Sequence, residues 1–290
     1  MISALLVKEL REKSGAGMMD AKKALLETDG DLEAAHDWLR TKGLLKAEKK
    51  ASRVAAEGLV GVTVHNDKGM IIELNSETDF VATNKEFIQL VDLILDKGFG
   101  VKDKDELLNK DVSGKSLQEV INNKIATIGE NISLRRIKSI KGPNIYAYVH
   151  NSVSKDCGKI GVLVSLQGNN DEDFGKKLAM HIAATSPLAM SETDLDKVVV
   201  EREKKIITEQ LVSEGKPADI AEKILSGKLK KFFEENTLLN QKFVMDPDVS
   251  IKKLLENNKQ TLIDFVRFKV GEGIDKKESD FAAEVKDIVS

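Results

Sequence analysis

Apolar residues at helical spacing form three short stripes within the first 54 residues of the chain. Small and polar residues at 14–17 and 28–31 interrupt this pattern, and the third stripe ends near Gly43. The members of the stripes are, in chain order, Leu5, Leu6, Leu10, Met18, Ala21, Leu25, Leu32, Ala35, Trp38 and Leu39. The pattern predicts a small three-helix domain over residues 1–54.

Two adjacent methionines, Met18 and Met19, begin the second predicted helix. Neighbouring residues on an α-helix point about 100° apart, so both side chains cannot lie at the centre of so small a core. At least one is therefore expected at the surface, where a flexible thioether suits binding to a partner protein. The alternative is that both side chains fill the core of the three-helix domain.

The segment 40–53 is strongly basic, with six lysines and arginines and one glutamate. Such a segment can bind phosphates, or it can be a solvated linker between two domains. In a protein of nearly neutral charge the linker is the favoured interpretation. The segment therefore predicts a domain boundary near residue 54.

Beyond this boundary the chain changes to alternating β-branched and apolar residues. Two alternating runs within 60–74 flank a turn at 66–69 and predict a β-hairpin. A capping box at 116–119 begins a later helix, and residues 132–137 alternate again as a strand. These elements predict a first core subdomain at 55–140.

The order of a hairpin followed by a helix occurs twice. A helical stripe containing Phe87 follows the first hairpin, and residues 147–165 form a second hairpin before a stripe containing Phe174. The repeat predicts an α+β fold with a duplicated core of antiparallel sheets packed on helices. The second core subdomain is expected at 141–193 and again at 237–270.

Between these two parts the β pattern disappears. Residues 194–236 carry two helical stripes separated by a glycine and a proline, which predicts an inserted antiparallel helical hairpin. The chain then returns to the core with a strand expected at 265–270. The charged end, 271–290, predicts a C-terminal helical module.

A polar loop between the first hairpin and the helix of Phe87 carries Phe80 at its crest. A capping box at 83–86 is expected to start the helix by satisfying free backbone N–H groups, which holds the loop rigidly. A phenylalanine on such a loop can probe the surface of a partner. The alternative is that Phe80 packs against the helix start or into the local core, as large aromatic residues usually do.

Composition limits the classes of function. The chain has 290 residues, 32% of them charged, with a formal net charge of −3, so no nucleic-acid partner is expected. A single cysteine, Cys157, excludes an internal disulfide framework and suits a reducing compartment. No apolar run approaches the ~20 residues that span a bilayer, and the first residues differ from a signal peptide. We expect a cytoplasmic protein with no membrane partner.

Motifs for chemistry are missing from the sequence. It contains no phosphate-binding loop, so no direct nucleotide binding is expected. The histidines and the cysteine have neither zinc-ligand spacing nor a nucleophilic arrangement, so no metal, no cofactor and no catalytic residue is expected. The sequence favours a multidomain binding protein over an enzyme.

Several motifs resemble those of one family. Residues 6–11 (LVKELR) and 14–25 (SGAGMMDAKKAL) are similar to the opening signature of bacterial translation elongation factor Ts, and TDFV at 78–81 resembles its second signature. Further similar segments follow in the same order at 128–132, 180–184, 243–245 and 267–274. The resemblance covers essentially the whole chain.

The resemblance implies a guanine-nucleotide exchange factor for elongation factor Tu, binding its GDP-bound and nucleotide-free forms. The family fold has a three-helix UBA-like N-terminal domain, two similar core subdomains, a helical hairpin and a C-terminal module. Carried over to this chain, the loop Thr78, Asp79, Phe80 and Val81 would enter beside the partner's magnesium and phosphate site. The other implied contacts are Met18, Met19, Ile128, Gly129 and His150.

Two other classes of function stay open from the residues alone. One is a ribosome- or RNA-associated protein that uses the basic segment 40–53. The other is an adaptor that binds a partner without changing the partner's nucleotide.

Overall fold

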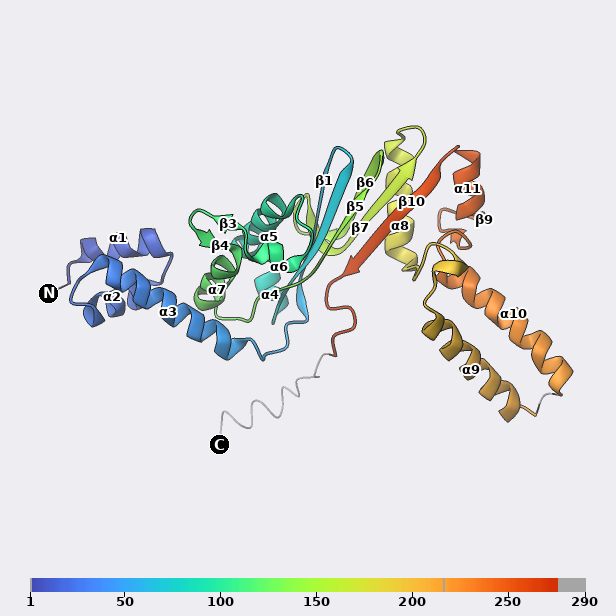
Figure 1. The fold of residues 1–290 in the computed structure, drawn as a ribbon, viewed down its shortest axis with the longest axis horizontal. Helices are drawn as coiled ribbons and strands as arrows, with labels where there is room; N and C mark the ends of the chain where they lie inside the picture. The colour runs from blue at the N-terminus through green and yellow to red at the C-terminus, as the bar shows by residue number, and fades with distance from the viewer. Residues whose placement is uncertain (1, 216, 276–290) are drawn as a thin grey trace.

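The chain is elongated, and its parts follow one another along the long axis (Figure 1). The computed structural model describes residues 2–215 and 217–275. The three-helix domain lies at one end, the β-sheet core in the middle, and the helical hairpin at the other end. The C-terminal module predicted at 271–290 lies, beyond Asp275, outside the described residues.

The first three helices are α1 (Ala4–Ser14), α2 (Met18–Glu27) and α3 (Leu32–Lys50). The Asp31 carboxylate caps α3 by accepting from the backbone N–H groups of Glu33 and Ala34. Leu5, expected in the apolar stripe of α1, is exposed, and Val7 is buried with Leu10 instead. The small core consists of Val7, Leu10, Ala21, Ala24, Leu25 and Ala35.

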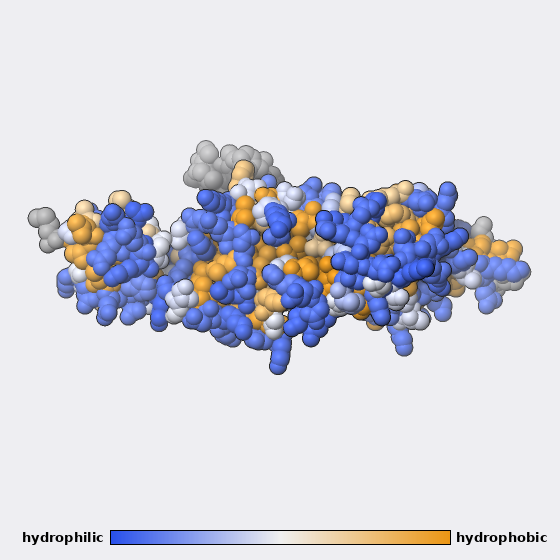
Figure 2. All heavy atoms as spheres, turned by 90° about the horizontal axis from the view of Figure 1, so that it is seen from above, coloured by the Kyte–Doolittle hydropathy of each residue, from blue (hydrophilic) through white to orange (hydrophobic). Residues whose placement is uncertain are grey.

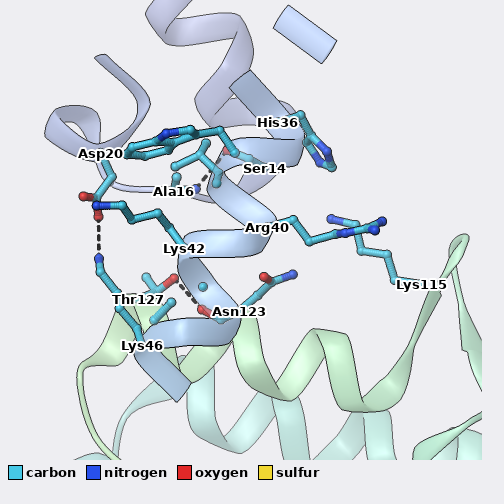
Figure 3. Close-up of a pocket in the computed structure, with 15 residues that line it drawn as sticks. Ser14, Ala16, Asp20, His36, Arg40, Lys42, Lys46, Lys115, Asn123 and Thr127 are labelled. Atoms are coloured by element: carbon cyan, nitrogen blue, oxygen red, sulfur yellow. Dashed lines mark hydrogen bonds and ion pairs between the residues drawn. The ribbon is translucent and has the colours of Figure 1, made fainter. Parts of the chain in front are cut away.

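Helix α3 is longer than the sequence predicts. Its apolar stripe weakens near Gly43, but the helix continues to Lys50 and packs on α7 (Leu117–Ile128). Gly43 and Ala47 are buried at this contact, and the cleft beside it has a volume of about 130 Å³ (Figure 3). The basic segment is therefore mostly part of a helix whose residues are largely exposed, as expected of a solvated segment, while Gly43 and Ala47 pack toward α7.

The first half of the core is built on the predicted hairpin. Strands β1 (Glu57–His65) and β2 (Lys68–Ser76) pair antiparallel, and β5 (Ser133–Lys141) pairs with the other edge of β2. Helices α5 (Lys85–Gly98) and α7 cover one face of this sheet. The predicted capping box at Ser116 begins α7. Shorter elements between these helices are α6 (Lys104–Leu108), β3 (Asp111–Val112) and β4 (Lys115–Ser116).

The second half repeats this order. The hairpin of β6 (Asn144–Ser152) and β7 (Cys157–Gln167) is followed by α8 (Glu172–Thr185), as predicted. Strand β10 (Thr261–Lys269) pairs with the other edge of β7. Between α8 and β10 lie η1 (Glu192–Asp194), β8 (Lys242–Phe243), β9 (Asp246–Ser250) and α11 (Ile251–Asn257).

The two halves join in one six-stranded sheet within the described part of the chain. The first residues of β7 pair with β1, and beyond this junction the two sets of strands pack face to face. Ile71 of β2 and Leu163 of β7 point into this shared layer, while Ile72 and Val162 point outward to the covering helices. The core therefore has helices on both outer faces and strands between them.

The predicted helical hairpin consists of α9 (Lys197–Ser213) and α10 (Ala218–Asn236). Lys228 Nζ of α10 donates to Gln210 Oε1 of α9 at 3.4 Å, as expected for antiparallel neighbours. Ile207 and Leu211 are the buried residues of α9. The hairpin points away from the core (Figure 1).

A buried carboxylate fixes the chain after β10. Glu73 is fully buried and pairs with Arg135 at 3.1 Å and Arg136 at 2.6 Å. It also accepts a hydrogen bond from the backbone N–H of Gly271 at 2.8 Å. A buried charge is tolerated because all of these donors face it.

Candidate functional site

The segment after β2 forms one helical turn, α4 (Asp79–Ala82), and not an open loop. Thr83 ends it, donating from its backbone to Asp79 O at 3.2 Å and from its hydroxyl to Phe80 O at 3.0 Å. The next helix is capped by Asn84, whose Oδ1 accepts from Glu86 N at 2.8 Å. The predicted capping box at 83–86 is therefore wrong by one position, because Thr83 closes α4.

Two neighbouring apolar residues of α4 have opposite environments. The Phe80 side chain is 82% exposed, whereas Val81 is 8% exposed and lies in the core beneath α5. The interpretation in which Phe80 tucks into the local core is therefore wrong. Asp79 is also exposed, at the first residue of the turn.

A second loop holds α4 from the other side. The Glu130 carboxylate accepts from Thr78 N at 3.0 Å and from the Thr78 hydroxyl at 2.6 Å. In the opposite direction, Glu77 accepts from Asn131 N at 2.6 Å. These bonds bring the predicted loop 78–81 next to Ile128 and Gly129, which end α7.

Gly129 occupies the left-handed region, with a φ of 88°, and ends α7 as its C-cap. Glycine adopts this conformation at little cost, which explains a glycine at the sharp reversal before Glu130. The Lys50 ammonium of α3 donates to the Gly129 carbonyl, and Arg53 pairs with Glu77 at 3.4 Å. The end of α3 is thus tied to both loops.

The two methionines lie on α2, away from α4 along the molecule (Figure 1). Met18 is 61% exposed and Met19 is 77% exposed, so neither fills the core of the three-helix domain. Met18 lines a groove with the basic residues Lys8, Arg11 and Lys22. This surface therefore combines a flexible apolar side chain, Met18, with the positive charges of Lys8, Arg11 and Lys22.

His150 lies on β6, in the other half of the core from α4. Its side chain is exposed, and its Nδ1 is 3.0 Å from the Tyr148 hydroxyl. The groove beside it is lined by the partly exposed apolar residues Met180, Val244 and Met245. His150 is therefore part of a third surface, separate in sequence and in the fold from those of Phe80 and Met18.

The exposed apolar residues belong to a surface that is otherwise largely hydrophilic. Figure 2 shows the molecule from above, with apolar residues at the surface of the three-helix domain and of the core among mostly hydrophilic ones. Within residues 2–215 and 217–275, no group of His, Cys, Asp and Glu could hold a metal ion, and no helix has the length and apolarity to cross a membrane. Burial raises the pKa of the Cys157 thiol, as expected for a structural residue.

The bonds made by Glu77, Glu130 and Asn131 have no local signal in the sequence. Glu130 and Asn131 follow a helix-ending glycine, which indicates a loop, but their partners are 52 and 54 residues away. Only the three-dimensional arrangement brings Glu130 to Thr78 and Asn131 to Glu77. The sequence therefore identifies the exposed aromatic residue and misses the side chains that hold its turn.

Comparisons with known proteins agree along the chain. A family model described as Elongation factor TS matches residues 77–272. The elongation factor Ts of Paracoccus denitrificans is 53% identical over 287 residues, covering 98% of this chain and 97% of the relative. Those of a Ruegeria species and of Dinoroseobacter shibae are each 52% identical over 284 residues, with the same coverage. The chain therefore belongs to the elongation factor Ts family.

Proposed function

We propose that this protein is a guanine-nucleotide exchange factor for elongation factor Tu and promotes GDP release through the turn at 78–81. The observation that carries the proposal is the position of Phe80, which is 82% exposed on a turn held at both ends. An exposed aromatic residue on a fixed turn suits burial in a partner. The protein changes the partner's affinity for nucleotide and carries out no chemical reaction of its own.

The physical basis of exchange is coupled binding. An exchange factor that weakens nucleotide binding is itself bound less tightly when nucleotide is present, because linkage is reciprocal. Phe80 promotes release only if its burial favours the open form of the partner over the nucleotide-bound form. Asp79, exposed beside it, acts at the partner's magnesium and phosphate site, either by repelling phosphate or by rearranging the ligands around the metal.

The other proposed contacts divide into separate regions. Ile128 and Gly129 lie beside the Phe80 turn and extend that contact. Met18 and Met19 contribute a second region on α2, and His150 a third on β6. Val81 is buried, so we assign it the task of anchoring the turn rather than touching the partner. A partner in contact with all three regions binds several anchors at once.

We also propose a division of the chain into domains. The three-helix domain is 1–54, the core subdomains are 55–140 and 141–193 with 237–270, the helical hairpin is 194–236 and the C-terminal module is 271–290. The proposal is supported by separate apolar clusters in the three-helix domain and in each half of the core. The partner is elongation factor Tu in its GDP-bound and nucleotide-free forms, in the cytoplasm.

The proposal is tested by release of a fluorescent GDP analogue from purified elongation factor Tu. We expect the full-length protein to accelerate release in a way that saturates with its concentration. Binding to elongation factor Tu without acceleration would make the protein an adaptor. An absence of binding would contradict the proposed partner.

A further inference from the structure

Two carboxylates connect the Phe80 turn to the loop after α7. Glu130 accepts from Thr78 N at 3.0 Å and from Thr78 Oγ1 at 2.6 Å, using a different oxygen for each. Glu77 accepts from Asn131 N at 2.6 Å. The two loops thus hold each other in both directions, and each bond has a charged acceptor, which makes it stronger than a neutral hydrogen bond.

The turn needs such support because α4 is only four residues long. A single turn of helix is unstable alone, because fixing its backbone costs more free energy than its first hydrogen bond contributes. Val81 attaches the turn to the core on one side, and Glu130 fixes the residue directly before it on the other. Asp79 and Phe80 therefore lie between two attached residues, Thr78 on one side and Val81 on the other.

We infer that Glu130 is a positioning residue for Phe80: it fixes the orientation of the exchange turn without itself contacting the nucleotide site. This inference rests on the proposed function of the turn. A turn that already has its bound orientation loses less conformational entropy when the partner binds. Glu130 therefore contributes to exchange through Phe80, and its contribution disappears when Phe80 is absent.

The same network extends to the three-helix domain. Arg53, just after α3, pairs with Glu77 at 3.4 Å, and Lys50 donates to the Gly129 carbonyl. The Asn131 side chain donates to Arg53 O at 2.8 Å. The end of α3, the loop at 128–131 and the Phe80 turn are therefore attached to one another at a single junction.

The test is a double-mutant cycle read by GDP release from elongation factor Tu. We expect Glu130→Ala to lower the second-order rate of stimulated release about tenfold, equivalent to about 1.4 kcal/mol. In a Phe80→Ala background the same change should lower the rate less than twofold, because the residue being positioned is gone. Additive effects of the two substitutions would overturn the inference.

Conservative variants distinguish hydrogen-bond geometry from charge. The amide of Glu130→Gln can accept from Thr78 N and donate to Thr78 Oγ1, so this variant should keep at least half of the wild-type rate. Thr78→Val keeps the shape and removes the hydroxyl, so it loses one of the two bonds to Glu130 and should lower the rate of stimulated release, by less than Glu130→Ala. This second variant tests the inference even if Glu130→Ala fails to fold. A wild-type rate in a folded Glu130→Ala variant would overturn it, as would a wild-type rate in Thr78→Val if Glu130→Ala does not fold.

Glu119 provides a matched control. Its carboxylate also accepts from the backbone N–H and the hydroxyl of one residue, Ser116, at 2.9 and 3.2 Å, but at the far end of α7. Glu119→Ala should lower the melting temperature and keep the exchange rate within twofold of wild type. An exchange loss equal to that of Glu130→Ala would show that general destabilisation explains both.

The outcomes separate this inference from the proposed function. If Phe80→Ala loses the stimulation of GDP release and Glu130→Ala keeps the wild-type rate, the proposed exchange function stands and the positioning role of Glu130 is overturned. A wild-type rate in Phe80→Ala contradicts the proposed use of the turn itself.

Discussion

At the scale of single residues, Phe80 and Val81 show that two neighbours on a one-turn helix can have opposite environments, one exposed and one buried. Both are large apolar residues in an otherwise polar segment, and neighbours on a helix point about 100° apart. The sequence identifies the segment, but the assignment of one side chain to the core depends on α5, β1 and β2, which close over Val81. That information is tertiary and has no local pattern.

The pair gives a direct prediction about stability. Val81→Ala should lower the free energy of unfolding by about 2 kcal/mol, because it leaves a cavity in a packed core. Phe80→Ala removes an exposed side chain and should change that free energy by less than about 0.5 kcal/mol. Urea denaturation of both variants measures the difference. An equal loss in the two would contradict the burial described for α4.

A second residue-scale prediction concerns His181, which is fully buried on α8. Its Nδ1 accepts from Val244 N at 3.3 Å, and its Nε2 lies 3.0 Å from Gln241 Oε1. The ring is therefore neutral, with the proton on Nε2. Burial lowers the pKa of His181 below its ordinary value of 6.5.

The sign of the pH effect follows from this lowered pKa. Below pH 6.5 the unfolded chain protonates His181 while the folded chain resists, so stability falls as the pH falls from about 6.5 toward the folded pKa. Unfolding free energies measured from pH 7.5 to pH 5 should show this decline, with a smaller slope in His181→Gln. The same slope in the variant and the wild type would contradict a neutral buried ring.

At the scale of elements, α3 is the clearest difference between pattern and structure. A glycine and a weak apolar stripe predict that the helix ends near Gly43. The small Gly43 instead permits close packing on α7, where Gly43 and Ala47 are buried.

Strand β2 also differs from its sequence pattern. Both of its faces are buried, whereas an alternating apolar run predicts only one buried face, the one that the helices cover.

The contact at Gly43 predicts a stabilising substitution. A Cβ placed there would lie 3.5 Å from Asn123 Oδ1 and 3.8 Å from the Ala126 Cβ, which are ordinary contacts. Gly43→Ala should therefore raise the free energy of unfolding by about 0.5–1 kcal/mol through helix propensity. Thermal denaturation checks this, with wild type as the reference. A lower melting temperature would mean that α3 and α7 pack more tightly than described.

At the scale of the whole molecule, the sequence predicts the order of the parts well. The three N-terminal helices, the two hairpin-and-helix units and the helical hairpin follow one another in the predicted order, although α3 continues beyond its predicted end. The junction among α3, the 128–131 loop and α4 is not predictable, because most of its bonds join residues more than 50 positions apart and the Arg53–Glu77 pair joins residues 24 positions apart. Local sequence patterns predict the helices and strands, but the contacts between these elements are known only from the three-dimensional structure.

The junction also bears on the RNA-binding alternative. Lys46, Lys50 and Arg53 of the basic segment are engaged within the protein, the first with Asp20 at 3.0 Å (Figure 3). We therefore expect no stable complex with transfer RNA in a gel-shift assay at 0.15 M salt. A complex whose affinity falls steeply as salt is added would support the RNA-binding alternative instead.

We propose that the exposed Phe80 drives GDP release from elongation factor Tu. The most direct measurement compares stimulated release by the wild type, Phe80→Ala and Val212→Ala, the last being an exposed apolar residue on α9. We predict a loss of about 30-fold for Phe80→Ala, as expected for a buried interface anchor worth ~2 kcal/mol. Val212→Ala should keep the wild-type rate. A folded Phe80→Ala variant that stimulates GDP release as fast as the wild type would contradict this role of Phe80.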